Sequence, residues 1–468
     1  MKLTILLLAA AAATFASSAV AAPQAKNVIF FLGDGMGPNT ITAARIYKAG
    51  EAGLLDFERM ERTARIKTYS ADAQVTDSAP SMGAYMTGVK VNNDVISMQD
   101  AKSIRPGKDA NGNSGIDNCG ANNGTAPMTI LELAKANGKA VGAITTTELT
   151  HATPASTYAH SCNRGLGYAI AQQLVPGGAG YNTRLGDGVD VLMGGGRQHF
   201  TPFDAATNKR GRADGRNLLT EMEERGYFVA ATRADMLSSR VGRKFIGIYA
   251  ADGHLDYGLK RAPTQPALAE MTAKAIALLA HNPNGFFLMV EGGKIDHALH
   301  DSNVKNALVE TVEFDAAIQT AIDRMRVIDP GLENTLIVVT ADHDHTIVMN
   351  GYPKRGNPVL DIVRGVDGQP ARDADGKTYT TLVFGNGPNR PDVRADVTSA
   401  VALSDDYKQE TAVRLAGEGH GGGDVKLFAT GAGSAPFRGT MENTRVFELM
   451  KAAFVPAEAG IHTNSNLR

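Results

Sequence analysis

Runs of apolar or β-branched residues recur along this chain, and each is followed at once by a turn that carries carboxylates, imidazoles or several glycines. The runs lie at residues 27–32, 140–147, 189–193, 286–290 and 335–340. Such runs are typical of strands that are buried on both faces. Patterns with helical spacing separate them, most clearly at 267–279 and 304–325. This alternation predicts an α/β fold in three layers, with a large, mainly parallel central sheet flanked by helices.

The residues that follow the predicted strands are a second constraint, because ligands bind beyond the carboxyl ends of the strands in an open α/β sheet. These positions, with a glycine-rich motif near residue 420, supply carboxylates and imidazoles but no thiolates. They are Asp34, Glu291, Asp296, His300, Asp342, His343 and His420. Such a set suits catalytic zinc together with a harder ion that prefers oxygen. Each residue alone has an ordinary structural explanation, a turn in the case of Asp34, but the combination predicts a metal site.

The segment 75–81, Val-Thr-Asp-Ser-Ala-Pro-Ser, places a serine where a loop is expected to enter a helix. Pro80 suits the first turn, and one helical face follows it. That face consists of Met82, Tyr85, Met86 and Val89. A helix N-terminus favours an anion, and the Ser78 hydroxyl there is a nucleophile if its pKa is lowered. A plain Ser/Asp cap is the commoner explanation of such a segment by itself, and the metal ligands elsewhere favour the nucleophile.

The predicted metal site and Ser78 suit one reaction. Asp296 and His300 are four residues apart, so on a helix they face the same way and can bind one ion. Two zinc ions on either side of Ser78 would form the clamp that serves in-line displacement at phosphorus. A guanidinium would hold the remaining phosphate oxygens in a fork, and Arg164 is a candidate, although most arginines are surface residues.

The net charge and the N-terminal residues indicate where the protein is located and which classes of partner it binds. With 47 basic and 49 acidic residues, the chain gives no argument for binding to nucleic acid or to a membrane surface. Residues 1–21 resemble a cleaved signal peptide, which predicts a periplasmic or secreted protein, and no later run suits a membrane span. Export permits a disulfide, so Cys119 and Cys162 are either bridged or two separate buried thiols.

Two segments interrupt the alternation of strand and helix. Residues 92–126 are rich in Asn, Gly, Asp and Ser and predict a long surface loop. Residues 349–418 show no strong period, which predicts an inserted subdomain between a first part of the core, residues 22–348, and a second part, residues 419–468, that completes the metal site.

Six motifs in order along the chain resemble the signature blocks of alkaline phosphatase. They are Gly33-Asp34-Gly35-Met36-Gly37, Thr76-Asp77-Ser78-Ala79, His151-Ala152-Thr153-Pro154, Glu291-Gly292-Gly293-Lys294-Ile295-Asp296-His297, Thr340-Ala341-Asp342-His343 and Gly419-His420-Gly421-Gly422. The resemblance runs from about residue 27 to residue 450. It implies a metal-dependent phosphomonoesterase that forms a phosphoserine on Ser78 and releases inorganic phosphate. It also implies a homodimer, with residues 349–418 as a crown-like insertion near its interface.

The resemblance further implies a role for each matching residue. The first zinc would take Asp296, His300 and His420; the second would take Asp34, Asp342, His343 and Ser78; a magnesium would take Asp34, Thr153 and Glu291. Arg164 would bind the substrate phosphate. Asp77 and His345 would lie behind the ligands, with His345 orienting a zinc carboxylate.

Residues 151 and 297 are both histidine, as in the animal enzymes, where the best-known enterobacterial form has aspartate and lysine. We expect His151 to contact the third ion through water and His297 to reach the phosphate through water. This predicts higher turnover and weaker retention of the third metal than in a His151→Asp variant.

Three alternatives stay open at this point. A sulfatase of the same superfamily needs an arginine two residues after the proline, and Met82 stands there. A phosphodiesterase usually carries threonine as nucleophile and lacks the arginine that grips a dianion. An exported phosphate- or metal-binding protein would bind without turnover and would not need Ser78.

Overall fold

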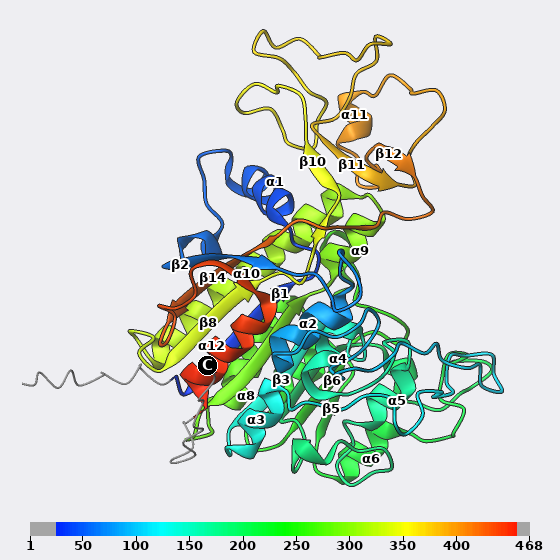
Figure 1. Ribbon diagram of the computed structural model, residues 1–468, viewed down its shortest axis with the longest axis vertical. Helices are drawn as coiled ribbons and strands as arrows, with labels where there is room; N and C mark the ends of the chain where they lie inside the picture. The colour runs from blue at the N-terminus through cyan, green and yellow to red at the C-terminus, as the bar shows by residue number, and fades with distance from the viewer. Residues whose placement is uncertain (1–24, 456–468) are drawn as a thin grey trace, which may run out of the picture.

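The computed structural model describes residues 25–455, and a ten-stranded sheet runs through its centre (Figure 1). The strands, in spatial order, are β15 (Gly439–Glu442), β2 (Arg62–Lys67), β14 (Val425–Gly431), β8 (Thr335–Thr340), β1 (Asn27–Gly33), β7 (Phe286–Gly292), β3 (Ala140–Glu148), β4 (Val191–Gly195), β6 (Phe245–Ile248) and β5 (Phe228–Ala230). Strand β14 pairs antiparallel with β8 and β2, and the other pairs of neighbours are parallel. The predicted mainly parallel sheet is confirmed.

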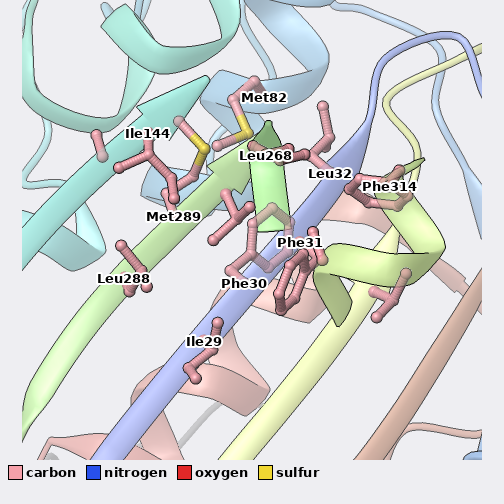
Figure 2. Packing of buried hydrophobic residues seen from close by; sticks show 14 of the residues in the cluster. Ile29, Phe30, Phe31, Leu32, Met82, Ile144, Leu268, Leu288, Met289 and Phe314 are labelled. Carbon is pink, nitrogen blue, oxygen red and sulfur yellow. The ribbon is translucent and has the colours of Figure 1, made fainter. Parts of the chain in front are cut away.

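Strand β1 shows why the chain forms three layers. Successive side chains of a strand point to opposite faces, and both faces of β1 are buried beyond its first residue. Phe30 contacts Tyr85 on one side of the sheet, with ring centroids 5.5 Å apart, and Phe31 contacts Phe314 on the other, at 5.9 Å. Figure 2 shows these phenylalanines among the side chains of the neighbouring strands and helices. Burying one such side chain stabilises the fold by roughly 1.5–3 kcal/mol, which favours an uninterrupted apolar strand here.

Helices cover both faces of the sheet. One layer holds α1 (Pro38–Ala49), α8 (Leu268–Leu279), α9 (Lys294–His300) and α10 (Val304–Ile328). The other holds α2 (Ser78–Thr87), α3 (Ile130–Ala136), α4 (Ala152–Tyr158) and α12 (Asn443–Phe454). The shorter helices α5 (Gly167–Gln172) and α6 (Leu218–Glu224) lie on the side of the sheet where β6 and β5 stand (Figure 1), and α7 (Arg233–Ser238) contacts β5. The predicted helices at 267–279 and 304–325 are present as α8 and α10.

Helix α2 differs from the prediction of one apolar face. All of its residues are buried, and it ends at Thr87, where Gly88 takes a left-handed conformation with φ of 74°. Val89 therefore lies beyond the helix. The cause is that α2 packs against α4 and α12 as well as covering the sheet, so no side of it faces solvent.

Residues 349–418 form a separate structure at the top of Figure 1. Three strands, β10 (Ile347–Met349), β11 (Leu382–Gly387) and β12 (Thr411–Arg414), make a small sheet beside the short helix α11 (Ser399–Ala402). Two further strands, β9 (Asp344–His345) and β13 (His420–Gly421), pair antiparallel where the excursion leaves and returns, so that His345 stands opposite His420. The excursion therefore returns the chain directly to the region of the predicted metal ligands.

Residues 92–126 run without a helix or a named strand, as predicted, apart from isolated bridges such as that between Gly107 and Ile116. A disulfide joins Cys119 to Cys162, whose Cα atoms are 5.7 Å apart. The loop is thus tied to the chain two residues before Arg164. Within residues 25–455, no helix combines the length and apolar character that crossing a membrane requires. The predicted signal peptide, residues 1–21, lies outside the described residues.

Candidate active site

Ser78 is the first residue of α2 and is 1% exposed. Its Oγ lies 3.3 Å from Asp34 Oδ1 and 3.3 Å from His343 Nε2. The preceding residue, Asp77, has the position of a helix cap, but its side chain makes no capping hydrogen bond. It pairs with the Arg164 guanidinium and accepts the Asp94 backbone N–H instead. The simple cap interpretation of this segment therefore fails for Asp77, and the Ser78 hydroxyl faces the predicted ligands.

Asp296, His300 and His420 converge on one point. Each imidazole is fixed by a hydrogen bond to a backbone carbonyl: His300 Nδ1 lies 2.6 Å from Glu418 O, and His420 Nδ1 lies 2.9 Å from Thr76 O. A carbonyl only accepts, so both Nδ1 atoms carry a proton, and the neutral form of each ring presents a lone pair at Nε2. These two Nε2 atoms are 3.1 Å apart, and Asp296 Oδ1 lies 3.1 Å and 3.5 Å from them. Converging lone pairs repel unless a cation lies among them, so these residues fit a zinc ion with three protein ligands.

A second group surrounds Ser78 on its other side. His343 Nε2 lies 3.2 Å from Asp34 Oδ1 and 3.7 Å from Asp342 Oδ2, and His343 Nδ1 lies 3.2 Å from the Asp344 carbonyl. Asp342 Oδ2 is buried and has no hydrogen-bond partner. Burial, and then the charge of Asp34, raises the pKa of Asp342 to about 7. A buried, unpartnered carboxylate oxygen is costly unless it binds a cation, so this group also fits a metal ion.

A third group lies below Asp34. Thr153 Oγ1 is 3.4 Å from Asp34 Oδ2, and Glu291 Oε2 accepts hydrogen bonds from Thr145 and Thr147. Glu291 Oε1 is buried and has no partner. Burial raises the pKa of Glu291 to about 7, and burial together with the charges of Asp296 and Glu291 raises the pKa of Asp34 well above its usual range. Carboxylate and hydroxyl oxygens are the ligands that magnesium prefers.

His345 lies between two carboxylates and is not free to bind an ion. Its Nε2 is 2.8 Å from Asp296 Oδ1, and its Nδ1 is 2.5 Å from Glu418 Oε2. Burial lowers the pKa of His345, but the hydrogen bonds to Asp296 and Glu418 outweigh burial and raise it to about 10. His345 is therefore an imidazolium that fixes Asp296, and Glu418 in turn fixes His345. The sequence prediction placed His345 behind a ligand but missed Glu418, although it stands two residues before His420.

Arg164 reaches the site from the segment after α4. One of its amino groups pairs with Asp77, and Nη2 lies 3.0 Å from His151 Nε2. A guanidinium only donates, so His151 Nε2 is the acceptor and the proton of that ring is on Nδ1, which is buried without a hydrogen-bond partner. Burial, and then the charge of Arg164, holds the pKa of His151 well below its usual range. In this tautomer His151 can donate to a water but presents no nitrogen lone pair to an ion beside Asp34.

His297 lies next to a histidine that sequence reasoning missed. The ring centroids of His254 and His297 are 4.1 Å apart, and His254 Nδ1 accepts the Glu148 backbone N–H at 3.0 Å. Burial lowers the pKa of His254 to about 2 and that of His297 to about 4, so both rings are neutral. His254 follows β6 in an Asp-Gly-His turn, so its place after a strand was the available signal.

Comparisons with known proteins agree with this geometry. A profile of the family described as "Alkaline phosphatase" matches residues 25–455. The tissue-nonspecific isozyme of alkaline phosphatase from Gallus gallus is 36% identical over 477 residues, which cover 95% of this chain and 87% of that protein. The cold-active alkaline phosphatase of the psychrophile Shewanella sp. is 27% identical, with a TM-score of 0.63 over 91% of this chain and 99% of that chain.

A further solved structure is that of TAB5 alkaline phosphatase in which a histidine is replaced by aspartate, with magnesium bound in its M3 site. It is 25% identical to this chain, with a TM-score of 0.63, and the match covers 92% of this chain and 99% of that one.

Proposed function

The chain belongs to the alkaline phosphatase family of metal-dependent phosphomonoesterases, and from that premise we propose that it hydrolyses phosphate monoesters through a phosphoserine on Ser78. The observation that carries the proposal is the position of the Ser78 hydroxyl. It lies 3.3 Å from His343 and from Asp34, and the first ligand group begins at Asp296, whose Oδ1 is 3.9 Å from His343 Nε2. A pure binding protein gains nothing from a buried hydroxyl at this point.

The proposed ions follow from the three ligand groups. A first zinc is assigned to Asp296, His300 and His420, a second zinc to Asp34, Asp342, His343 and Ser78, and a magnesium to Asp34, Thr153 and Glu291. The facing Nε2 lone pairs and the unpartnered oxygens of Asp342 and Glu291 support this assignment. Bound zinc would lower the pKa of the Ser78 hydroxyl and of water and would stabilise the departing oxygen.

The chain's own residues would orient the phosphate for in-line attack. Ser78 Oγ forms the new bond to phosphorus while the ester oxygen leaves, and water later releases inorganic phosphate from Ser78. The free backbone N–H groups at the start of α2 and the Arg164 fork suit the non-bridging oxygens. Arg164 is held by Asp77 at one amino group, which fixes its orientation. His297, whose Nε2 has no partner, would reach the phosphate through water.

Two further proposals concern export, which rests on the signal-peptide-like residues 1–21, and assembly, which rests on the family resemblance. We propose that the protein is exported to the periplasm or secreted, and that it is a homodimer with residues 349–418 near the interface. Exposed apolar side chains in that segment, such as Tyr352 and Val366, are consistent with an interface there. Light scattering of the mature protein tests the dimer, and a monomer at working concentration contradicts it.

The first experiment is hydrolysis of a chromogenic phosphomonoester by the zinc- and magnesium-loaded protein, with Ser78→Ala and with a chelator. We expect Ser78→Ala to lower kcat by roughly three orders of magnitude or more while keeping its zinc. Ser81→Ala is the matched control, since its hydroxyl donates to the Asp342 carbonyl at 2.7 Å rather than facing the ligand groups. Absence of turnover by the loaded wild type rejects the proposal. Faster hydrolysis of a diester than of the monoester would show that the protein is a phosphodiesterase rather than a phosphomonoesterase.

A further inference from the structure

A cleft of about 350 Å³ adjoins the phosphate-binding end of the site. Arg164 and His151 line one part of it. The loop 92–126, the residues around 148–150 and 165–168, and the segment 199–210 line the rest, and we call this pocket the cationic cleft. Besides Arg164 and His151, its lining residues are Lys108, Gly112, Asn113, Ser114, Glu148, Thr150, Gly165, Gly167, Tyr168, His199 and Arg210. Because Arg164 lines the cleft and also pairs with Asp77, the residue before Ser78, a substrate held by Arg164 has this cleft beside it.

The charges of the cationic cleft are unbalanced. Arg164, Lys108 and Arg210 line it, against the single carboxylate of Glu148. The Lys108 ammonium donates to Ser114 Oγ at 3.1 Å, and among residues 25–455 no carboxylate lies within ion-pair distance of it. Arg210 pairs with Asp252 at 2.8 Å, and both side chains are more than half exposed, so most of that guanidinium stays open to solvent. Arg164 also pairs with Asp77, so Lys108 and Arg210 supply most of the excess positive charge, and a cleft lined mainly by cations attracts anions.

Buried side chains fix the part of the cleft around His199, which also contains the Glu148 carboxylate, 3.7 Å from His199 Nδ1. His199 Nδ1 lies 2.6 Å from Thr150 Oγ1, and its ring meets the edge of Tyr168 with centroids 5.0 Å apart. Burial lowers the pKa of His199 to about 3, so the ring is neutral. Gly167 permits this packing, because a Cβ there would lie 2.6 Å from the His199 ring.

Polar contacts across the cleft hold its two walls together. Asn113 Nδ2 donates to the Lys209 carbonyl at 3.1 Å, and the Tyr168 hydroxyl donates to the Arg210 carbonyl at 2.6 Å. The Cys119–Cys162 disulfide ties the same loop to the chain beside Arg164. Lys108 and Arg210 are therefore presented by connected walls rather than by two independent loops.

We propose that the cationic cleft binds a second phosphate group, carried on the leaving-group side of the substrate, so that bisphosphates are preferred over simple monoesters. This inference rests on the proposed function, since it places the reacting phosphate between Ser78 and Arg164. Lys108 and Arg210 are then left for the second group. Two cations match the charge of a phosphate dianion, and an arginine fork with a lysine point charge is a common way to bind one.

The test compares α,ω-alkanediol bisphosphates with the corresponding alkyl monophosphates, with chains of increasing length, on the metal-loaded full-length enzyme. The readout is the ratio of kcat/KM for the bisphosphate to that for the monophosphate. Two equivalent phosphates give a ratio of about two without any cleft. We expect a ratio of about ten or more at one chain length, and we expect Lys108→Ala/Arg210→Ala to return it to about two.

The matched control is Lys102→Ala/Arg105→Ala, which removes the same two charges from exposed residues of the same loop that do not line the cleft. This variant should keep the wild-type ratio. A ratio near two in the wild type at every chain length overturns the inference, as does an equal fall in both double variants. Absence of monophosphate turnover in the loaded wild type is a different failure, because it rejects the proposed function itself.

Discussion

Arg164 lines the cationic cleft and pairs with Asp77 beside Ser78, so the cleft and the three ligand groups are neighbours, but the molecule builds them in different ways. The ligand groups stand mainly at strand ends and on the helices that follow, they are mostly buried, and two of their oxygens, in Asp342 and Glu291, have no hydrogen-bond partner. The charges of the cleft come from loops, and Lys108 and Arg210 are exposed. The difference indicates that the rigid core fixes the chemistry, while surface loops that can vary at little cost to the core set the preference among esters.

Removing the disulfide is the strongest test of the separation between core and loops, because this bond joins the loop 92–126 to the chain beside Arg164. We expect Cys119→Ser/Cys162→Ser to lower the free energy of unfolding by about 2–4 kcal/mol, measured by urea denaturation. Zinc content should stay at the wild-type level, since no ligand is on the loop, whereas the bisphosphate-to-monophosphate ratio should fall.

Wild-type protein treated with a mild reductant is the control for that variant and should behave in the same way. Loss of zinc together with loss of the ratio would contradict a separation between core and loops. A change in unfolding free energy below 1 kcal/mol would show that the loop is held without the bond.

Glu418 tests the core side. We expect Glu418→Gln to speed zinc loss to a chelator by roughly 10–100-fold, because His345 then loses the carboxylate that holds it against Asp296. The bisphosphate-to-monophosphate ratio of the reloaded enzyme should not change. Glu410→Gln removes the charge of a glutamate that pairs with Arg394 in the excursion and should leave zinc retention unaltered. Wild-type zinc retention in Glu418→Gln would refute this role.

His151 lies on the border between the two regions. We expect His151→Asp to bind magnesium about tenfold more tightly and to turn over more slowly, because a carboxylate can ligate directly, whereas the histidine tautomer set by Arg164 cannot. Equilibrium dialysis with magnesium measures the change. His151→Asn, which adds an oxygen but no charge, should give a smaller gain, and unchanged magnesium affinity in His151→Asp would disprove the idea.

Glu148 tests the cleft side with the smallest expected effect. Burial raises the pKa of this carboxyl, so the folded protein binds its proton more tightly than the unfolded chain does. As pH rises through that pKa, Glu148 ionises, offsets the positive charge of Lys108 and Arg210, and repels the bound anion. Glu148→Gln should therefore raise the bisphosphate-to-monophosphate ratio by at most about twofold at alkaline pH and leave it unchanged at acid pH. A rise at acid pH alone would contradict this sign.

The core side was predictable from the sequence because its signals are local. An apolar run that ends next to Asp34, Glu291 or Asp342 predicts both a buried strand and a metal ligand at its end. Asp296 and His300 are four residues apart, and their side chains meet as helical spacing requires. The edge strand β15 and its neighbour β2 were not predicted, since both are partly exposed and their runs contain charged residues.

The cleft could not be predicted, because its parts are far apart in the chain. Lys108 and Arg210 stand in irregular segments, and no periodicity relates one loop to the other. The contact of Asp77 with Arg164 was missed for the same reason, as was that of Glu418 with His345. Such contacts depend on how distant segments pack in the tertiary structure, and the local sequence pattern does not determine that packing.

The order of the ligands along the chain has a consequence for biosynthesis. The first ligand is Asp34 and the last is His420, and β14, which lies between β8 and β2, follows His420. Chains are made from the N-terminus, so most of the polypeptide exists before His420 does. A product that ends before residue 420 lacks the second imidazole of the first ligand group as well as the strand that joins β2 and β15 to the sheet. Under the proposed assignment, the first metal site is therefore complete only when nearly the whole chain has been made.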